Sequence, residues 1–320
     1  MFAEFAAIDL DMLLASAGPA AVRGPRIFAL GSGHRGSGVT TLSWLLAMAL
    51  ADLGRSTILL DSDLAASGLY GRSDPAGNET RLRRFLQERG EDINRLPQPA
   101  GLKNLAFITG TSAMADHPRL SLAAKQKLLL HLRKLQADEL IIDCGQGASY
   151  RHLDLFLAAD HSLVIARIPN SSLLESYQFI RYGFLRKIQH QSRHWPELFA
   201  RISRLGDLTH PDRVETLPAF TDRLQQANPH LTAVIAEGWA SFQPRLIVNR
   251  VQPDVERRRV QAMVEVVKAV LGITLKDWGD VPEDERLRKT QASGKLEGMQ
   301  HSRAAAEMAR IVRQRLLVNQ

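Results

Sequence analysis

A glycine-rich turn between an apolar run and an apolar helix is the feature that most constrains how this chain folds. Residues 26–32 (RIFALGS) have the composition of a buried strand, residues 31–41 (GSGHRGSGVTT) form the turn, and LSWLLAMAL follows at once. Glycines let successive backbone N–H groups turn inward, and a helix that begins there adds partial positive charge. This order predicts a phosphate-binding loop. A strand-to-helix turn without any ligand is the alternative.

Short apolar runs rich in β-branched residues alternate with longer segments of helical spacing from Arg26 to Gln320. This alternation is typical of an α/β fold with a mostly parallel sheet and helices on both faces. We expect seven strands in one sheet, at 26–32, 56–63, 104–110, 139–145, 161–169, 244–251 and 273–281. Helices are expected at 40–53, 122–135, 172–187, 256–270 and 303–318, the third of them starting with a capping box of Ser172 and Glu175.

Two segments interrupt this alternation. Residues 1–22 form an apolar N-terminal extension that ends in a joint rich in Gly, Pro and Ala, and residues 23–320 are expected to form one domain. Within that domain, residues 190–243 carry four prolines between short amphipathic pieces. Prolines interrupt helices, so this pattern predicts a helical insertion between two strands of the sheet.

Composition and charge exclude several classes of protein. The chain has 320 residues, 45% of them hydrophobic and 23% charged, which is enough for a large apolar core. Its one cysteine, Cys144, cannot form an intrachain disulfide, and no run of about eighteen apolar residues would span a bilayer. We therefore expect a cytoplasmic protein. The formal net charge of +7 favours polyanionic partners such as nucleotides, nucleic acid or an acidic membrane face.

Acidic residues close two of the expected strands. Asp61 and Asp63 end the second strand, and Asp143 ends the fourth. The carboxyl ends of parallel strands face one crevice, so these carboxylates and the loop are expected to converge. Thr40 and Asp143 would hold Mg²⁺, and Asp63 would orient a water molecule at a γ-phosphate. The alternative is that Asp63 and Asp143 cap the helices that follow them.

The loop and the strand ends together resemble the MinD/ParA family of dimeric P-loop ATPases, in which the loop reads Ser-Gly-Lys-Gly-Gly-Val-Gly-Lys-Thr-Thr. Asp63 matches the family's water-positioning aspartate, and Asp143 lies in its magnesium-site segment. Residues 153–187 and the insertion look most like the branch of MinD-like proteins related to the flagellar-number regulator FlhG. The loop residues that fall on their family counterparts are Ser32, Gly33, Gly36, Gly38, Thr40 and Thr41.

The C-terminal part is similar to the same family. Residues 248–250 (VNR) resemble the strand end that contacts adenine, and residues 279–284 (GDVPED) resemble the Gly-x-x-Pro-x-Asp segment. The resemblance implies a P-loop NTPase fold that binds ATP or ADP with Mg²⁺, the metal on Thr40 and Asp143. It implies nucleotide contacts from Gly33, His34, Arg35, Gly36, Ser37, Gly38, Val39, Thr40, Thr41, Asn249 and Pro282.

The family loop carries two lysines, and this chain has neither. Val39 stands where the family has the lysine that reaches the β- and γ-phosphates, and His34 stands where a signature lysine reaches across the dimer. Valine has no charge and no donor, and single cationic groups in phosphoryl transfer are worth about a thousandfold or more in rate. We therefore expect a pseudo-ATPase that binds nucleotide with weak or absent hydrolysis. Partial substitution by Arg35 or His34 is the alternative.

The basic and histidine-containing segments have two interpretations, one as ordinary structural or solvated residues and one as sites for metal or DNA. His190 and His194 are four residues apart and would share a helix face, but no further metal ligand lies at a useful spacing. Two groups of basic residues are expected on solvated faces, with DNA contact as the alternative. These groups are Arg257 to Arg259, and Arg181, Arg186, Lys187, Arg193, Arg201 and Arg204.

The last expected helix is amphipathic, with arginines around an apolar stripe that includes Met308, Ile311 and Val312. We expect it to pack on the sheet. The alternative is a peripheral contact with the inner face of the membrane, in which basic residues meet acidic headgroups.

These features together predict a regulatory protein that controls the position or number of a cellular structure through partner proteins. It would act as a homodimer, or as a heterodimer with a related ATPase. Two alternatives stay open. One is an active ATPase of the MinD/FlhG type in which Arg35 replaces the lost lysine, and the other is an interaction scaffold that binds no nucleotide.

Overall fold

The computed structural model describes residues 24–62, 82, 84–86, 91–109, 122–168, 170–191, 205, 216–252, 257–293 and 298–317. The expected N-terminal extension, Asp63 and His194 lie outside the described residues.

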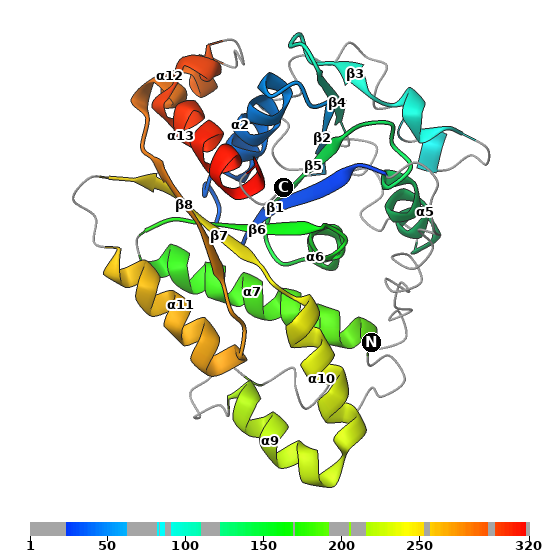
Figure 1. Ribbon diagram of the computed structural model, residues 1–320, viewed down its shortest axis with the longest axis vertical. Coiled ribbons are helices and arrows are strands. Elements are labelled where there is room, and N and C mark those ends of the chain that lie inside the picture. Colours follow the sequence, from blue (N-terminus) through cyan, green and yellow to red (C-terminus); the bar gives the residue numbers. More distant parts are fainter. Residues whose placement is uncertain are drawn as a thin grey trace.

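A single sheet of eight described strands organises the molecule, in the order β3-β4-β2-β5-β1-β6-β7-β8 (Figure 1). All neighbouring strands are parallel except β3 and β4. The predicted α/β fold is confirmed, but the expected seven strands omitted the two-residue strand β3, which is too short to leave a pattern. The strands are β1 (Arg26–Ser32), β2 (Thr57–Asp61), β3 (Gln98–Pro99), β4 (Leu105–Thr109), β5 (Glu139–Gln146), β6 (His161–Ala166), β7 (Arg245–Val251) and β8 (Lys276–Pro282).

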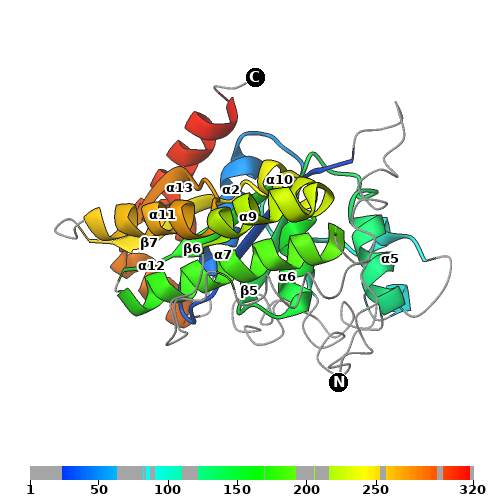
Figure 2. The ribbon, with the colours of Figure 1, turned by 90° about the horizontal axis from the view of Figure 1, so that it is seen from below.

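Helices cover both faces of this sheet, and Figures 1 and 2 agree in placing α2 and α13 on one face and α6 and α7 on the other. Helices α9 and α10 pack beyond α7 and α11, within the predicted insertion between β6 and β7. The α-helices are α2 (Val39–Asp52), α5 (Leu122–Leu132), α6 (Tyr150–Leu157), α7 (Asn170–Gln191), α9 (Leu217–Ala227), α10 (Pro229–Ser241), α11 (Arg258–Leu271), α12 (Glu285–Ser293) and α13 (Arg303–Val312). Short turns are η2 (Ile93–Arg95), η3 (Met299–His301) and η4 (Arg313–Leu317).

The sequence patterns missed two helices and misplaced one helix start. Helix α6 has only eight residues, and α12 (ERLRKTQAS) has almost no apolar stripe to reveal it. The predicted capping box is wrong, because α7 begins at Asn170 and Ser172 already lies inside the helix. Glu175, the other member of the proposed box, forms an ion pair with His34 instead.

Helix α2 is buried along nearly its whole length because it is covered by the sheet on one side and by α13 on the other. The apolar stripe of α13, with Met308, Ile311 and Val312, belongs to the same core cluster as α2. The last helix therefore packs on the body of the protein, as expected, and this stripe is not on the surface. No helix in the described part of the chain combines the length and the apolar character that crossing a membrane requires.

Two of the arginines expected on a solvated face are buried. Arg181 is 2% exposed and donates to the carbonyl of Leu205, with Nε to O at 2.9 Å. Arg186 is 7% exposed and donates two hydrogen bonds to the fully buried Asp154, from Nε to Oδ1 at 2.7 Å and from Nη2 to Oδ2 at 3.1 Å. These arginines are structural, and neither is available to DNA.

His190 completes this buried cluster, with Nε2 at 3.1 Å from Oδ1 of Asp154. The cluster ties α6 to α7, because Asp154 lies on α6 while Arg186 and His190 lie on α7. Among the described residues no group of three or more His, Cys, Asp and Glu is arranged to hold a metal ion. His190 thus has a role in holding two helices together.

Replacing Asp154 by Asn should destabilise the protein strongly. Removing one partner leaves the Arg186 charge buried without its carboxylate, which typically costs about 3–5 kcal/mol. Urea unfolding followed by circular dichroism measures this loss. Glu285→Gln is a control, since Glu285 forms an exposed i,i+4 pair with Lys289 and its loss should leave the midpoint unchanged. A loss for Asp154→Asn as small as that of the control would contradict this account.

Candidate functional site

The glycine-rich loop, residues 33–38, lies at the carboxyl end of β1 in the middle of the sheet. Strand β1 has β5 on one side and β6 on the other, and β7 follows β6. In a parallel sheet all these strands end at the same edge. The topology therefore brings Gln146 of β5, Arg167 just beyond β6, and Asn249 of β7 to the loop.

Two glycines of the loop adopt left-handed backbone conformations. Gly36 has φ of 73° and Gly38 has φ of 93°, a region that residues with a side chain rarely occupy. A Cβ atom on Gly38 would lie 2.2 Å from Nδ2 of Asn249, whereas one on Gly36 would meet nothing within 4 Å. Glycine at 38 is thus required both by the backbone and by the close approach of Asn249.

Three side chains from neighbouring strands brace the loop through its backbone. Asn249 donates from Nδ2 to the carbonyl of Ser37 at 2.7 Å, and Arg167 donates from Nη1 to the carbonyl of Gly36 at 3.1 Å. The backbone N–H of Gly36 donates to Oε1 of Gln146 at 3.0 Å. This N–H points to an acceptor of the protein, so a phosphate that takes it would displace Gln146.

Asn249 uses both ends of its amide. Its Oδ1 accepts from the backbone N–H of Arg250 at 2.9 Å, and the residue is 6% exposed. The amide therefore holds the loop, a role that its family resemblance did not indicate, and a contact with adenine stays a prediction. Thr41, Asn249 and Pro282 nevertheless line one small pocket together.

The two positions that lost their lysines are engaged elsewhere in the fold. Val39 is 4% exposed and belongs to the apolar core cluster of α2. His34 pairs through Nδ1 with Oε2 of Glu175 on α7, at 2.5 Å. Arg35, expected as a partial substitute for the lysine, is exposed to solvent. The side chain of Val39 thus lies in the core, that of His34 lies beside Glu175, and substitution for the lysine by Arg35 or His34 stays a prediction.

Arg167 contacts the loop, and Arg250 lies close enough to Arg167 for their charges to interact. Arg167 has a buried Nε with no acceptor among the described residues, besides its bond to Gly36. Burial and then the charge of Arg167 lower the pKa of Arg250, and Glu283 partly offsets this. Arg167 follows the end of the apolar strand β6, and this position in the sequence is the signal that could have indicated it.

Asp143 lies at the end of β5, fully buried. Its Oδ1 accepts from the backbone N–H of Gly145 at 2.9 Å, and its carbonyl accepts from Ser62 at the end of β2. Asp143 does not cap α6, which starts at Tyr150 after Ser149, so that alternative is wrong for Asp143, while Asp63 lies outside the described residues. Thr40 is half-buried in the first turn of α2.

These residues fit a Mg²⁺ ion only in the presence of a nucleotide. Carboxylate and hydroxyl oxygens suit the ion, and Mg²⁺ in proteins commonly completes its shell with phosphate oxygens and water. The described residues offer no cluster of three acidic or histidine ligands that would hold a metal without such help. The donor set is therefore compatible with a metal that arrives with phosphate.

Solved structures of MinD and ParA-type proteins share this architecture. A plasmid partition protein of Borrelia burgdorferi bound to AMPPNP superposes with a TM-score of 0.55 at 16% identity, covering 91% of this chain and 100% of that one. MinD of Pyrococcus horikoshii complexed with Mg-ADP gives a TM-score of 0.54 at 16% identity, covering 92% and 97%. The chain has the fold of the MinD/ParA class of P-loop ATPases.

The sequence itself is also similar to curated proteins. The antiactivator FleN of Pseudomonas aeruginosa is 25% identical over 194 residues, which are 57% of this chain and 68% of that protein. No family profile matches the chain. The resemblance to the MinD/ParA family, near its FlhG-like branch, is confirmed by these comparisons.

Substituting Gly38 should harm the protein more than substituting Gly36. Gly36→Ala should cost about 1–2 kcal/mol, from the left-handed backbone alone. Gly38→Ala adds a collision with Asn249 and the loss of its bond to Ser37, for a total of about 2–4 kcal/mol. Chemical unfolding of both variants measures the difference.

A double mutant tests the cause of that difference. In the Asn249→Ala background the collision is absent, so Gly38→Ala should cost no more than Gly36→Ala does in the same background. Equal costs for the two glycine substitutions in the native background would show that Asn249 does not constrain position 38.

Proposed function

We propose that this protein is a MinD/ParA-type nucleotide-binding regulator that holds ATP or ADP with Mg²⁺ and hydrolyses it weakly or not at all. The observation that carries the proposal is the position of Val39, whose side chain is buried in the apolar core of α2. Cationic stabilisation of the transferred phosphoryl group is commonly the largest part of catalysis. A protein that keeps the loop and loses this charge is suited to binding rather than to turnover.

Positive charge for the phosphates would come from Arg167 and Arg250. Their guanidinium groups are close enough for the charge of Arg167 to lower the pKa of Arg250. A phosphate beside both groups would relieve their repulsion and accept from Nε of Arg167, which has no acceptor among the described residues. These arginines stand at the ends of β6 and β7 rather than on α2, so they replace the charge of the lysine without its position.

Thr40 and Asp143 would hold Mg²⁺ together with phosphate oxygens. Asp143 reaches this place from the end of β5, and Thr40 from the first turn of α2. When bound, the ion would neutralise phosphate charge. Asp63 would orient a water molecule in any residual turnover.

The regulatory part of the proposal rests on the similarity to FleN, which is named as an antiactivator. By analogy, this chain would oppose an activator protein in a nucleotide-sensitive way, in the cytoplasm, and so control the position or number of a cellular structure. Dimerisation, with itself or with a related ATPase, would follow the pattern of the family.

Calorimetric titration of the full chain with ATP and ADP in the presence of Mg²⁺ tests nucleotide binding, and phosphate release measures turnover. We expect binding with little or no phosphate release. The absence of any heat would favour a scaffold without nucleotide. Turnover at an ordinary MinD-like rate that Asp63→Ala abolishes would favour an active enzyme and overturn the proposal.

The source of the positive charge can be tested by two arginine variants. Arg167→Ala should weaken ATP binding about tenfold or more, because a charge-assisted hydrogen bond is worth roughly 1.5–3 kcal/mol. Arg35→Ala is the matched control and should change the affinity less than threefold, since Arg35 is exposed. Both affinities are read by the same titration. A larger loss of affinity for Arg35→Ala than for Arg167→Ala would indicate that Arg35, in the loop, substitutes for the lysine.

A further inference from the structure

A second cavity lies at the opposite edge of the sheet from the loop. Four strands, β1, β6, β7 and β8, are neighbours in the sheet, and each begins with a basic residue or histidine. A cavity of about 430 Å³ opens at these strand starts. Besides Asp277, Trp278, Arg315 and Leu316, its lining consists of the four first residues, Arg26, His161, Arg245 and Lys276.

The acidic residues nearest to this cavity are already paired. Glu139 forms two hydrogen bonds with Arg26, the shorter with Nη2 to Oε1 at 2.6 Å. Asp277 pairs with Arg257, which lies outside the lining, at 2.9 Å. These two carboxylates therefore pair with Arg26 and with a neighbour of the cavity, and neither forms an ion pair with Arg245, Lys276 or Arg315 in the described part of the chain.

The remaining three cations have only neutral acceptors. Lys276 donates from Nζ to Oε1 of Gln243 at 2.9 Å, and Arg245 donates to the carbonyl of the same residue at 3.3 Å. Arg315 donates from Nε to the carbonyl of Trp278 at 3.5 Å. Within the described residues, none of the three forms an ion pair with a carboxylate.

The pKa of His161 responds to the positive charges around the cavity. The pKa of His161 is lowered to about 4, chiefly by burial and then by the charges of Arg245, Arg26 and Lys276, while Asp160 partly offsets them. Asp160 is itself paired with Arg133 at 2.9 Å. An anion in the cavity would reverse the charge contribution to this shift.

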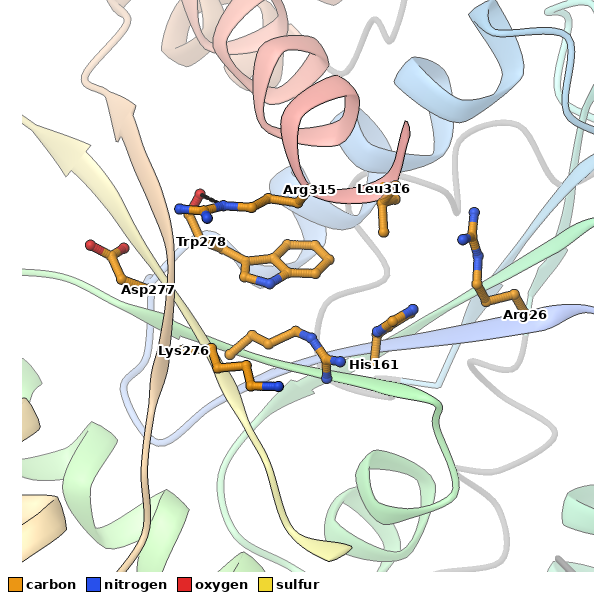
Figure 3. Close-up of a pocket in the computed structure, with 8 residues that line it drawn as sticks. Arg26, His161, Lys276, Asp277, Trp278, Arg315 and Leu316 are labelled. Carbon is orange, nitrogen blue, oxygen red and sulfur yellow. Dashed lines mark hydrogen bonds between the residues drawn. The ribbon is translucent and has the colours of Figure 1, made fainter. Parts of the chain in front are cut away.

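The cavity also has a flat apolar wall. Figure 3 shows Arg315 on one side of the Trp278 ring and His161 on the other, with Leu316 nearby. The ring of His161 lies 5.9 Å from that of Trp278, and the guanidinium carbon of Arg245 lies 5.6 Å from the Trp278 ring. The volume is within the range of small-molecule sites, roughly 300–1,000 Å³. Charged and apolar surfaces thus meet in a space of ligand size.

We propose that this cavity binds a small phosphorylated molecule carrying at least two negative charges, separately from the nucleotide loop. Arginine and lysine are the residues that recognise phosphate, arginine through paired N–H donors and lysine as a point charge. The seven-residue strand β1 separates the cavity from the loop by about 20 Å, at about 3.3 Å per residue. One ligand therefore cannot occupy both sites at once.

Inorganic pyrophosphate is the simplest probe of this site. It should bind the full chain in calorimetry, and it should bind the Arg167→Ala variant with the same affinity, because that variant alters only the loop. Arg315→Gln should weaken binding about tenfold or more. Arg313→Gln is the matched control, since Arg313 lies on the same turn, is exposed and does not line the cavity. It should change the affinity less than twofold.

A second variant and a spectroscopic signal make the test independent of one residue. Lys276→Gln should also weaken binding, whereas Lys268→Gln on the exposed side of α11 should not. Saturation with pyrophosphate should raise the pKa of His161 from about 4, as followed by NMR of the imidazole.

Several results would overturn the inference. Equal weakening by Arg313→Gln and Arg315→Gln would indicate a general charge effect. Loss of pyrophosphate binding in Arg167→Ala would place the anion at the loop instead. Binding to phosphatidylserine vesicles without any binding of pyrophosphate would assign these cations to a lipid surface. Failure of ATP to bind the loop would leave this inference untouched, because the two sites share no residue.

Discussion

One hydrogen bond, from the Asn249 amide to the Ser37 carbonyl, holds the functional edge of this protein together. It joins residues 212 positions apart in sequence and fixes the glycine loop against the end of β7. The bond is possible only because Gly38 has no side chain to keep Asn249 away. The same amide also accepts a hydrogen bond from the backbone N–H of Arg250. It therefore also fixes the end of β7 at the pocket that Arg250 and Pro282 line.

Positive charge near the loop comes from the ends of the strands beside it. The two loop positions at which the related family has lysine hold a buried valine and a histidine paired with Glu175. Arg167, just beyond β6, contacts the loop instead, and Arg250, at the end of β7, lies close enough to Arg167 for their charges to interact. In the proposed function, charge supplied from the strand ends would attract a phosphate without replacing the cation that the related family places at the start of α2.

Local patterns predicted the elements of the fold because those patterns follow burial. The strand starting at Arg26 and the helix α5 with Leu128 and Leu132 were predicted, since their apolar residues lie in the core. Elements without an apolar signature, β3 and α12, were missed. The glycine loop and Asp143 were identified by composition and position. The bracing by Gln146 and Arg167 was not, because it depends on which strands become neighbours, and no local pattern encodes the strand order.

The hydrogen bond between the Gly36 N–H and Gln146 has a consequence for how the loop meets its ligand. The protein itself supplies the acceptor for this N–H of the loop. An incoming phosphate exchanges one acceptor for another and gains only the difference between them. The end of β5 would sense that exchange, because the displaced amide belongs to the residue three positions after Asp143. Occupancy of the loop would thereby change the orientation of a single glutamine on an adjacent strand.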